Sequence, residues 1–266
     1  MHILLVGFGN MGRALARGWR ASAADQAQIT VFDTSATARE RALALGFVAP
    51  DALSEVQSPI DIAVLAVKPA QLETVLGDCP AAGLYVSIAA GRTIADIAAM
   101  VSPDAAVVRA MPNTPAAIGQ GITGLCANAI ATARDRELAT ELLSAVGEVE
   151  WLDQESDIDA VTAVSGSGPA YVFLLIESLT AAAIELGLDS QLAERLATAT
   201  VRGAGAYAAQ SDADAQTLRR QVTSPNGTTA AAIEILSQDD AFKKLLLKAV
   251  KAAARRSREL GSGRAR

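Results

Sequence analysis

The chain has 266 residues, enough for one large domain or two ordinary ones, and 51% of them are hydrophobic although only 4% are aromatic. Its formal net charge of −6 offers no basic surface for DNA or RNA, so we expect a small-molecule partner and no nucleic acid. The two cysteines, Cys79 and Cys126, lie far apart and His2 is the one histidine, which excludes the usual metal-ligand and histidine acid–base patterns.

The strongest motif lies near the start of the chain, between an expected buried strand at 2–6 and an expected helix at 11–23. In this fingerprint of dinucleotide binding, Gly7 allows a tight turn, Gly9 lets the backbone approach a pyrophosphate and Gly12 allows close packing of helix and strand. The helix start then directs N–H groups and the positive end of its dipole at the phosphates. The residues predicted to bind the cofactor here are Val6, Gly7, Phe8, Gly9, Asn10, Met11 and Gly12.

The second expected strand, at 29–32, ends at Asp33. A carboxylate in this place binds the ribose 2′-hydroxyl and repels a 2′-phosphate, which favours NADH. Against this, Thr34 and Ser35 could donate hydrogen bonds to a phosphate, and arginines that follow could neutralise it. Asp33 could also be a helix N-cap. The sequence leans toward NADH and leaves NADPH open.

Strands and helices continue to alternate up to residue 153, which predicts an α/β Rossmann-type domain over residues 1–153. Because ligands bind beyond the carboxyl ends of parallel strands, Lys68 and Asn113 are expected at the cofactor edge, although Lys68 could equally be a solvated lysine. The segment 47–49 could add a short strand. The other expected strands are 60–67, 84–90, 107–111, 121–126 and 149–152.

After Asp153 the strand patterns stop, and alanine-rich helices are expected at 170–186 and 191–209. These helices are apolar almost all round, so they need partners on more than one side. We therefore predict an all-α domain over residues 154–266 that binds substrate and forms a dimer.

We expect no membrane span, because the apolar run 60–67 is too short and Glu177 interrupts a later one. The first residues read as a strand rather than a leader, so the expected location is the cytoplasm.

A second polar turn runs from Val222 to Ala230. Its Pro-Asn-Gly sequence makes a tight turn, and Thr228 or Thr229 could cap the helix that follows. N–H groups and hydroxyls at a helix start suit a small carboxylate, each charge-assisted hydrogen bond contributing about 1.5–3 kcal/mol. An ordinary capped turn would have the same residues, so this stretch alone leaves both interpretations open.

Five segments, in order along essentially the whole chain, resemble the pyrroline-5-carboxylate reductase family, and the region 218–236 matches that family's signature. Asn226 stands where the family usually has glycine, and asparagine tolerates the left-handed backbone that such a turn needs. The segment 33–35 lacks the arginine of many NADPH-preferring members. The resembling segments are Gly7–Gly12, Ala66–Pro69, Met111–Pro115, Val164–Tyr171 and Val222–Thr229.

The resemblance implies a role for each matching set of residues. The adenosine diphosphate half of NAD(P)H would bind the glycine turn together with Thr34 and Ser35. The substrate would bind at Ser224, Gly227, Thr228 and Thr229, with backbone amides on its carboxylate and the Thr229 hydroxyl on its ring nitrogen. Each site would be built from two subunits of an interlocked homodimer, alone or within a larger assembly of dimers. The residues implied to flank ribose and nicotinamide are Ala66, Val67, Lys68, Pro69, Ile88, Ala89 and Ala90.

The implied reaction is hydride transfer from reduced NAD(P)H to the C=N carbon of Δ1-pyrroline-5-carboxylate, which gives L-proline in the last step of proline biosynthesis. A protonated imine is already electrophilic, so catalysis would come mainly from positioning, a contribution of roughly 7–11 kcal/mol in well-oriented reactions. Thr229 is the expected catalytic residue, orienting the imine and relaying its proton.

Two other functions are weighed against this reaction. A related oxidoreductase could act on a β-hydroxyacid or another cyclic imine, but β-hydroxyacid enzymes commonly use a helix lysine, and no lysine occurs between Lys68 and Lys243. A nucleotide-sensing protein could bind NAD(P)H without turnover, but it would give the polar turn at 224–229 no purpose.

Overall fold

The computed structural model describes residues 1–22 and 27–261. They form two compact units. The first contains Met1–Ser167 and the chain from Ala253 onward, and the second contains Gly168–Ala252. The division concerns packing, and the functional boundary after residue 153 stays a prediction.

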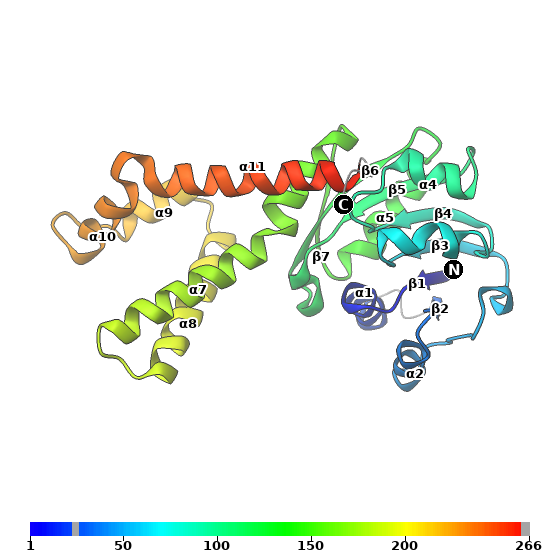
Figure 1. Ribbon diagram of the computed structural model, residues 1–266, viewed down its shortest axis with the longest axis horizontal. Helices are drawn as coiled ribbons and strands as arrows, with labels where there is room; N and C mark the ends of the chain where they lie inside the picture. The colour runs from blue at the N-terminus through cyan, green and yellow to red at the C-terminus, as the bar shows by residue number, and fades with distance from the viewer. Residues whose placement is uncertain (23–26, 262–266) are drawn as a thin grey trace. The chain divides into compact units, whose positions relative to one another are not determined.

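A seven-stranded sheet forms the centre of the first unit (Figure 1). Its strand order is β2-β1-β3-β4-β5-β6-β7, in which the first five strands pair in parallel, β6 runs antiparallel to β5, and β7 is parallel to β6. The Rossmann-type prediction is therefore confirmed. The expected strand at 47–49 is wrong, since Val48 forms an isolated bridge to Thr30. The strands are β1 (His2–Val6), β2 (Gln28–Phe32), β3 (Ile60–Leu65), β4 (Ala82–Ser87), β5 (Ala106–Met111), β6 (Gly121–Ala127) and β7 (Gly147–Trp151).

Helices cover both faces of this sheet. Successive strand side chains point to opposite faces, and those on each face belong to a separate hydrophobic core. On one face, Trp19 of α1 is fully buried and its indole Nε1 donates to the Leu142 carbonyl of α5 at 2.8 Å. On the other face, α3, α4 and α6 supply apolar side chains such as Leu72, Ile97 and Ile158. The helices of the first unit are α1 (Asn10–Ala21), α2 (Ala36–Ala44), α3 (Leu72–Leu76), α4 (Ile94–Val101), α5 (Ala133–Ser144) and α6 (Ile158–Val161).

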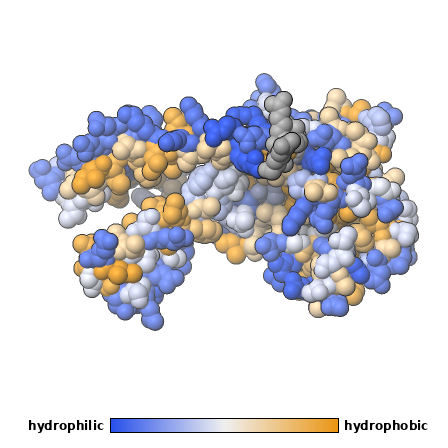
Figure 2. Space-filling model, in the orientation of Figure 1, coloured by the Kyte–Doolittle hydropathy of each residue, from blue (hydrophilic) through white to orange (hydrophobic). Residues whose placement is uncertain are grey.

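The second unit is helical, as expected, and its apolar residues remain largely exposed. Helices α7 and α8 pack against each other, and Ala193 and Ala197 are buried on α8. Phe173 and Leu174 of α7 are more than half exposed. Figure 2, in the orientation of Figure 1, shows hydrophobic residues on the visible surface of these helices. The remaining helices are α7 (Gly168–Glu185), α8 (Ser190–Ala209), α9 (Ala215–Gln221), α10 (Thr228–Ser237) and α11 (Ala241–Gly261), which ends in the first unit.

One helical run corrects the expectation that no segment is long enough to span a membrane. By length and composition, Glu155–Glu185 could cross a bilayer, with a mean hydropathy of 1.4 and none of its most apolar 18 residues buried. Glu177 does not lower this average enough to interrupt the run. A surface of this kind needs a cover, which can be lipid or another protein.

Candidate cofactor and substrate sites

The glycine turn joins β1 to α1 in close contact with the neighbouring strands. Gly7 has φ +104° and donates its N–H to the Phe32 carbonyl at 2.7 Å, and a Cβ built on it would lie 2.7 Å from the backbone of Ala66. A Cβ on Gly12 would overlap the carbonyl oxygen of Gly7. At Gly9, by contrast, no atom of the described chain lies within 4 Å of the built Cβ. The protein's own packing accounts for Gly7 and Gly12, whereas the open space beside Gly9 leaves room for a ligand to approach the backbone.

The start of α1 is open to an anion. Its N-cap is Gly9, which has no side chain, and no side-chain cap hydrogen bond is formed at this helix start within the described chain. The N–H groups of the first turn and the positive end of the dipole therefore face the space beside Gly9. The residues present fit a pyrophosphate.

Asp33 lies directly beyond β2, and each of its carboxylate oxygens accepts a hydrogen bond from a backbone N–H. Oδ2 accepts from the N–H of Phe8 at 2.7 Å, and Oδ1 accepts from the N–H of Ser35 at 2.8 Å. Its alternative interpretation as a helix N-cap is wrong, because the N-cap of α2 is Ser35. The two backbone donors fix a negative charge beside the glycine turn.

Arg39 forms hydrogen bonds with the backbone of the loop that contains Asp33 and Thr34. Its Nη1 donates to the carbonyls of Asp33 and Thr34 at 2.9 and 3.2 Å, and its Nη2 lies 2.9 Å from Oδ1 of Asp51. Arg39 is thus committed to protein partners around Thr34 and Ser35.

The loops after β3 and β4 leave the sheet at the edge where the glycine turn lies. Ala66 donates to the Val6 carbonyl at 2.7 Å, and Ile88 donates to the Leu65 carbonyl at 3.1 Å. Pairing of parallel strands therefore brings together three of the predicted cofactor segments. Lys68 is exposed on its loop, and Ala90 is exposed next to a buried Ala89.

Asn113 is buried, and its side chain serves internal contacts. Its Nδ2 donates to the carbonyl of Ser165 at 3.2 Å, and its Oδ1 accepts from the N–H of Ile122 at 3.0 Å. Both ends of the amide are used to tie the end of β5 to β6 and to the π-helical turn at Thr162–Gly166. Cofactor contact by Asn113 stays a prediction.

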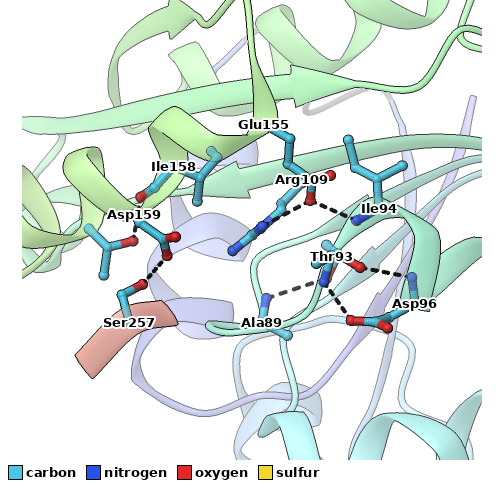
Figure 3. Close-up of polar contacts among 11 residues, drawn as sticks. Ala89, Thr93, Ile94, Asp96, Arg109, Glu155, Ile158, Asp159 and Ser257 are labelled. Carbon is cyan, nitrogen blue, oxygen red and sulfur yellow. Dashed lines mark hydrogen bonds and ion pairs between the residues drawn. The ribbon is translucent and has the colours of Figure 1, made fainter. Parts of the chain in front are cut away.

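An ion pair between Arg109 of β5 and Glu155 was not predicted from the sequence. Arg109, buried in β5, places Nη1 2.9 Å from Oε1 of Glu155, and the same oxygen accepts from the N–H of Ile94 at 2.8 Å (Figure 3). A charged residue inside an apolar strand signals such a partner, but the sequence does not identify a partner 46 residues away.

The polar turn Val222–Ala230, expected to bind substrate, lies in the second unit between α9 and α10. Gly227 donates to the Ser224 carbonyl at 3.1 Å, and Asn226 has φ +61°, which confirms the tight turn and its left-handed asparagine. The N-cap of α10 is Gly227, so the expectation that Thr228 or Thr229 caps this helix is wrong. Both threonines instead lie in the first turn, where their N–H groups and hydroxyls surround the helix start.

Both cysteines are free thiols, with Cys126 buried and Cys79 half-buried. Burial raises the pKa of the Cys79 thiol to about 11 and also raises the pKa of Cys126. Both thiols are therefore protonated at neutral pH.

Comparisons with known proteins cover both halves of the chain. Residues 155–260 match the family model described as pyrroline-5-carboxylate reductase dimerisation, and residues 2–91 match that of the NADP oxidoreductase coenzyme F420-dependent family. The chain is 45% identical to a pyrroline-5-carboxylate reductase of Pseudomonas aeruginosa, covering 97% of this chain and 96% of that one. It is 36% identical to one from Vibrio alginolyticus over 97% of both chains.

Solved structures agree. A pyrroline-5-carboxylate reductase from Coxiella burnetii superimposes with a TM-score of 0.90 at 36% identity, covering 97% of both chains. A pyrroline carboxylate reductase from Plasmodium falciparum, solved with NADP bound, gives a TM-score of 0.82 at 30% identity over 98% of both chains.

Proposed function

The chain belongs to the pyrroline-5-carboxylate reductase family, and from that premise we propose that it reduces the C=N bond of Δ1-pyrroline-5-carboxylate to L-proline with NAD(P)H, the last step of proline biosynthesis. The observation that carries this proposal is similarity along nearly the whole chain to a reductase of that name, at 45% identity. The open glycine turn and the polar turn before α10 supply the two binding elements that the reaction requires.

We assign the dinucleotide to the edge of the sheet where the strand loops meet. The N–H groups at the start of α1 bind the pyrophosphate, Thr34 and Ser35 contact the adenosine half, and Asp33 accepts from a ribose hydroxyl. When bound, the reduced nicotinamide supplies the hydride. The further residues assigned to its ribose and ring are Ala66, Val67, Lys68, Pro69, Ile88, Ala89, Ala90 and Asn113.

We assign the substrate to the start of α10. The N–H groups of Gly227, Thr228 and Thr229, with the hydroxyl of Ser224, bind the carboxylate, where each charge-assisted bond contributes about 1.5–3 kcal/mol. The Thr229 hydroxyl orients the ring nitrogen and relays its proton. These residues position an imine that is electrophilic once protonated, so a strong general acid is not required.

The proposed assembly is a homodimer, alone or within a larger assembly of dimers, located in the cytoplasm. The exposed apolar run Glu155–Glu185 coincides with the start of the region that matches the dimerisation family, so a second subunit is its proposed cover rather than lipid. We place the functional boundary after residue 153, with cofactor binding before it and substrate binding and dimerisation after it.

The test is an assay of the purified full chain with Δ1-pyrroline-5-carboxylate and with NADH or NADPH in turn. We expect loss of nicotinamide absorbance that depends on the imine and equals the proline formed. Binding of NAD(P)H without turnover would instead support a nucleotide-sensing protein. Oxidation of a β-hydroxyacid with NAD(P)⁺, together with no imine reduction, would overturn the proposed substrate.

A further inference from the structure

A hydrogen bond between side chains joins the end of α11 to α6. Ser257 is the buried residue of this helix within the described chain, at 6% exposed. Its Oγ donates to Oδ1 of Asp159, on α6, at 2.5 Å (Figure 3). A hydrogen bond to a carboxylate is roughly twice as strong as one between neutral groups, and burial shields this one from water.

The last residues of α11 contact the loop after β4 backbone to backbone. Gly91 has φ +74°, and a Cβ built on it would lie 3.0 Å from the carbonyl carbon of Leu260 and 3.1 Å from the nitrogen of Gly261. A Cβ on Gly261 would likewise lie 3.3 Å from the Gly91 carbonyl oxygen. The Cβ of Leu260 lies at the same contact, 3.1 Å from a Cβ built on Gly91. One turn earlier, Ser257 adds a hydrogen bond that holds this helix end.

The other end of the same loop is held by the segment that contains Asp159. Glu155 lies four residues before Asp159, and its Oε1 accepts from the N–H of Ile94 while pairing with buried Arg109. Arg92 adds a bond from Nη2 to the Pro69 carbonyl at 3.2 Å. The loop thus has one end at Ile88, held by the Leu65 carbonyl, and the other at Ile94, and between them Gly91 rests on α11.

We propose that Ser257 is a positioning residue for the nicotinamide. Its bond to Asp159 holds the last turn of α11 against Gly91, and this contact fixes Ile88, Ala89 and Ala90. The inference rests on the proposed function, in which these three residues flank the nicotinamide. The adenosine half of the dinucleotide is assigned to the glycine turn, a segment separate from the loop that contains Gly91.

The test compares two ligands on the full-length chain. In Ser257→Ala, the Kd for NAD(P)H, measured by nicotinamide fluorescence, rises roughly three- to tenfold, the size typical of mutations that act through a neighbour. The Kd for ADP, which lacks both the nicotinamide and its ribose, stays at the wild-type value. Asp159→Ala gives the same pattern, and the double variant is no worse than either single one.

Two further variants make the test specific. Arg256 is adjacent to Ser257, and its partner Glu259 is on the same helix. Arg256→Ala should therefore leave both Kd values unchanged. Asp159→Asn keeps an oxygen acceptor for Ser257, so its effect is smaller than that of Asp159→Ala.

The inference is overturned if Ser257→Ala binds NAD(P)H as tightly as the wild type. It is also overturned if the variant loses ADP affinity to the same extent, because that pattern indicates general destabilisation. Neither measurement needs the imine, so a wild-type chain that binds NAD(P)H but fails to reduce Δ1-pyrroline-5-carboxylate contradicts the proposed function alone.

Discussion

The two units of this chain bury their apolar residues to very different extents. In the first unit, every residue of β1 and of β5 is buried, and helices cover both faces of the sheet. In the second unit, α7 and α10 have no buried residue within the described chain. The first unit completes its own core, whereas the second leaves an apolar surface exposed, which we propose a second subunit covers. Cofactor binding should therefore survive changes that abolish assembly, and catalysis should not.

The largest expected effect comes from a charge on the exposed face of the second unit. Leu174 on α7 is 61% exposed. In Leu174→Glu the carboxylate would be buried without a partner at the dimer face, so we expect a monomer whose kcat/KM falls at least about a hundredfold. Light scattering after size exclusion, together with the imine assay, measures both effects, and NAD(P)H still binds.

A matched control places the same charge on the first unit. Ile118 is 74% exposed there, so Ile118→Glu should leave oligomeric state and activity as in the wild type. If Leu174→Glu behaves like this control, the contrast between the two units is wrong.

The next effect separates chemistry from cofactor binding. Thr229→Ala removes the hydroxyl proposed to orient the imine, and kcat/KM should fall roughly ten- to a hundredfold, the loss expected for one hydrogen bond to a charged group. NAD(P)H affinity stays unchanged, because the cofactor site lies in the first unit. Thr229→Ser keeps the hydroxyl and should recover most of the rate; a Thr229→Ala enzyme with wild-type kcat/KM would exclude this role.

A smaller effect tests how the first unit selects its cofactor. Asp33→Ser removes the charge fixed by the N–H groups of Phe8 and Ser35, so the ratio of kcat/KM for NADPH over NADH should rise roughly tenfold. The ratio is the proper measure, because loss of those two hydrogen bonds weakens the binding of NADH and NADPH alike and cancels in the ratio. Asp33→Asn, which removes the charge and little else, should change the ratio in the same direction. An unchanged ratio in both variants means that Asp33 does not contact the ribose.

The smallest effect concerns stability at high pH. Burial raises the pKa of Cys79 from 9.0 to about 11, so the unfolded chain releases this proton at lower pH than the folded one. The free energy of unfolding should therefore decline as pH rises from 9 toward 11. In Cys79→Ala, denaturant unfolding should show a shallower decline over the same range; equal slopes would contradict the burial of this thiol.

Local patterns were enough to predict much of the fold. The glycine turn, the strand ending at Asp33 and the Pro-Asn-Gly turn each carry their signal within a few neighbouring residues. Helix α4 was missed although Thr93 and Asp96 form a capping box that can be read from the sequence.

Contacts between distant segments could not be predicted in this way. Glu155 pairs with Arg109 across 46 residues, and Ser257 pairs with Asp159 across 98. The charge of Arg109 within an apolar strand signals that a partner exists, but the sequence does not identify which distant residue it is. The position of Asn113 after a strand could be predicted, but its distant partners could not. Its side chain joins the end of β5 to β6 and to the π-helical turn.

The most direct test of the central claim follows the hydride itself. The full chain is incubated with Δ1-pyrroline-5-carboxylate and NADH or NADPH carrying deuterium at the transferred position of nicotinamide C4, and the proline is examined by mass spectrometry and NMR. The account predicts L-proline with a single deuterium on C5, the former imine carbon. Unlabelled proline, or oxidation of the cofactor without proline, would contradict it.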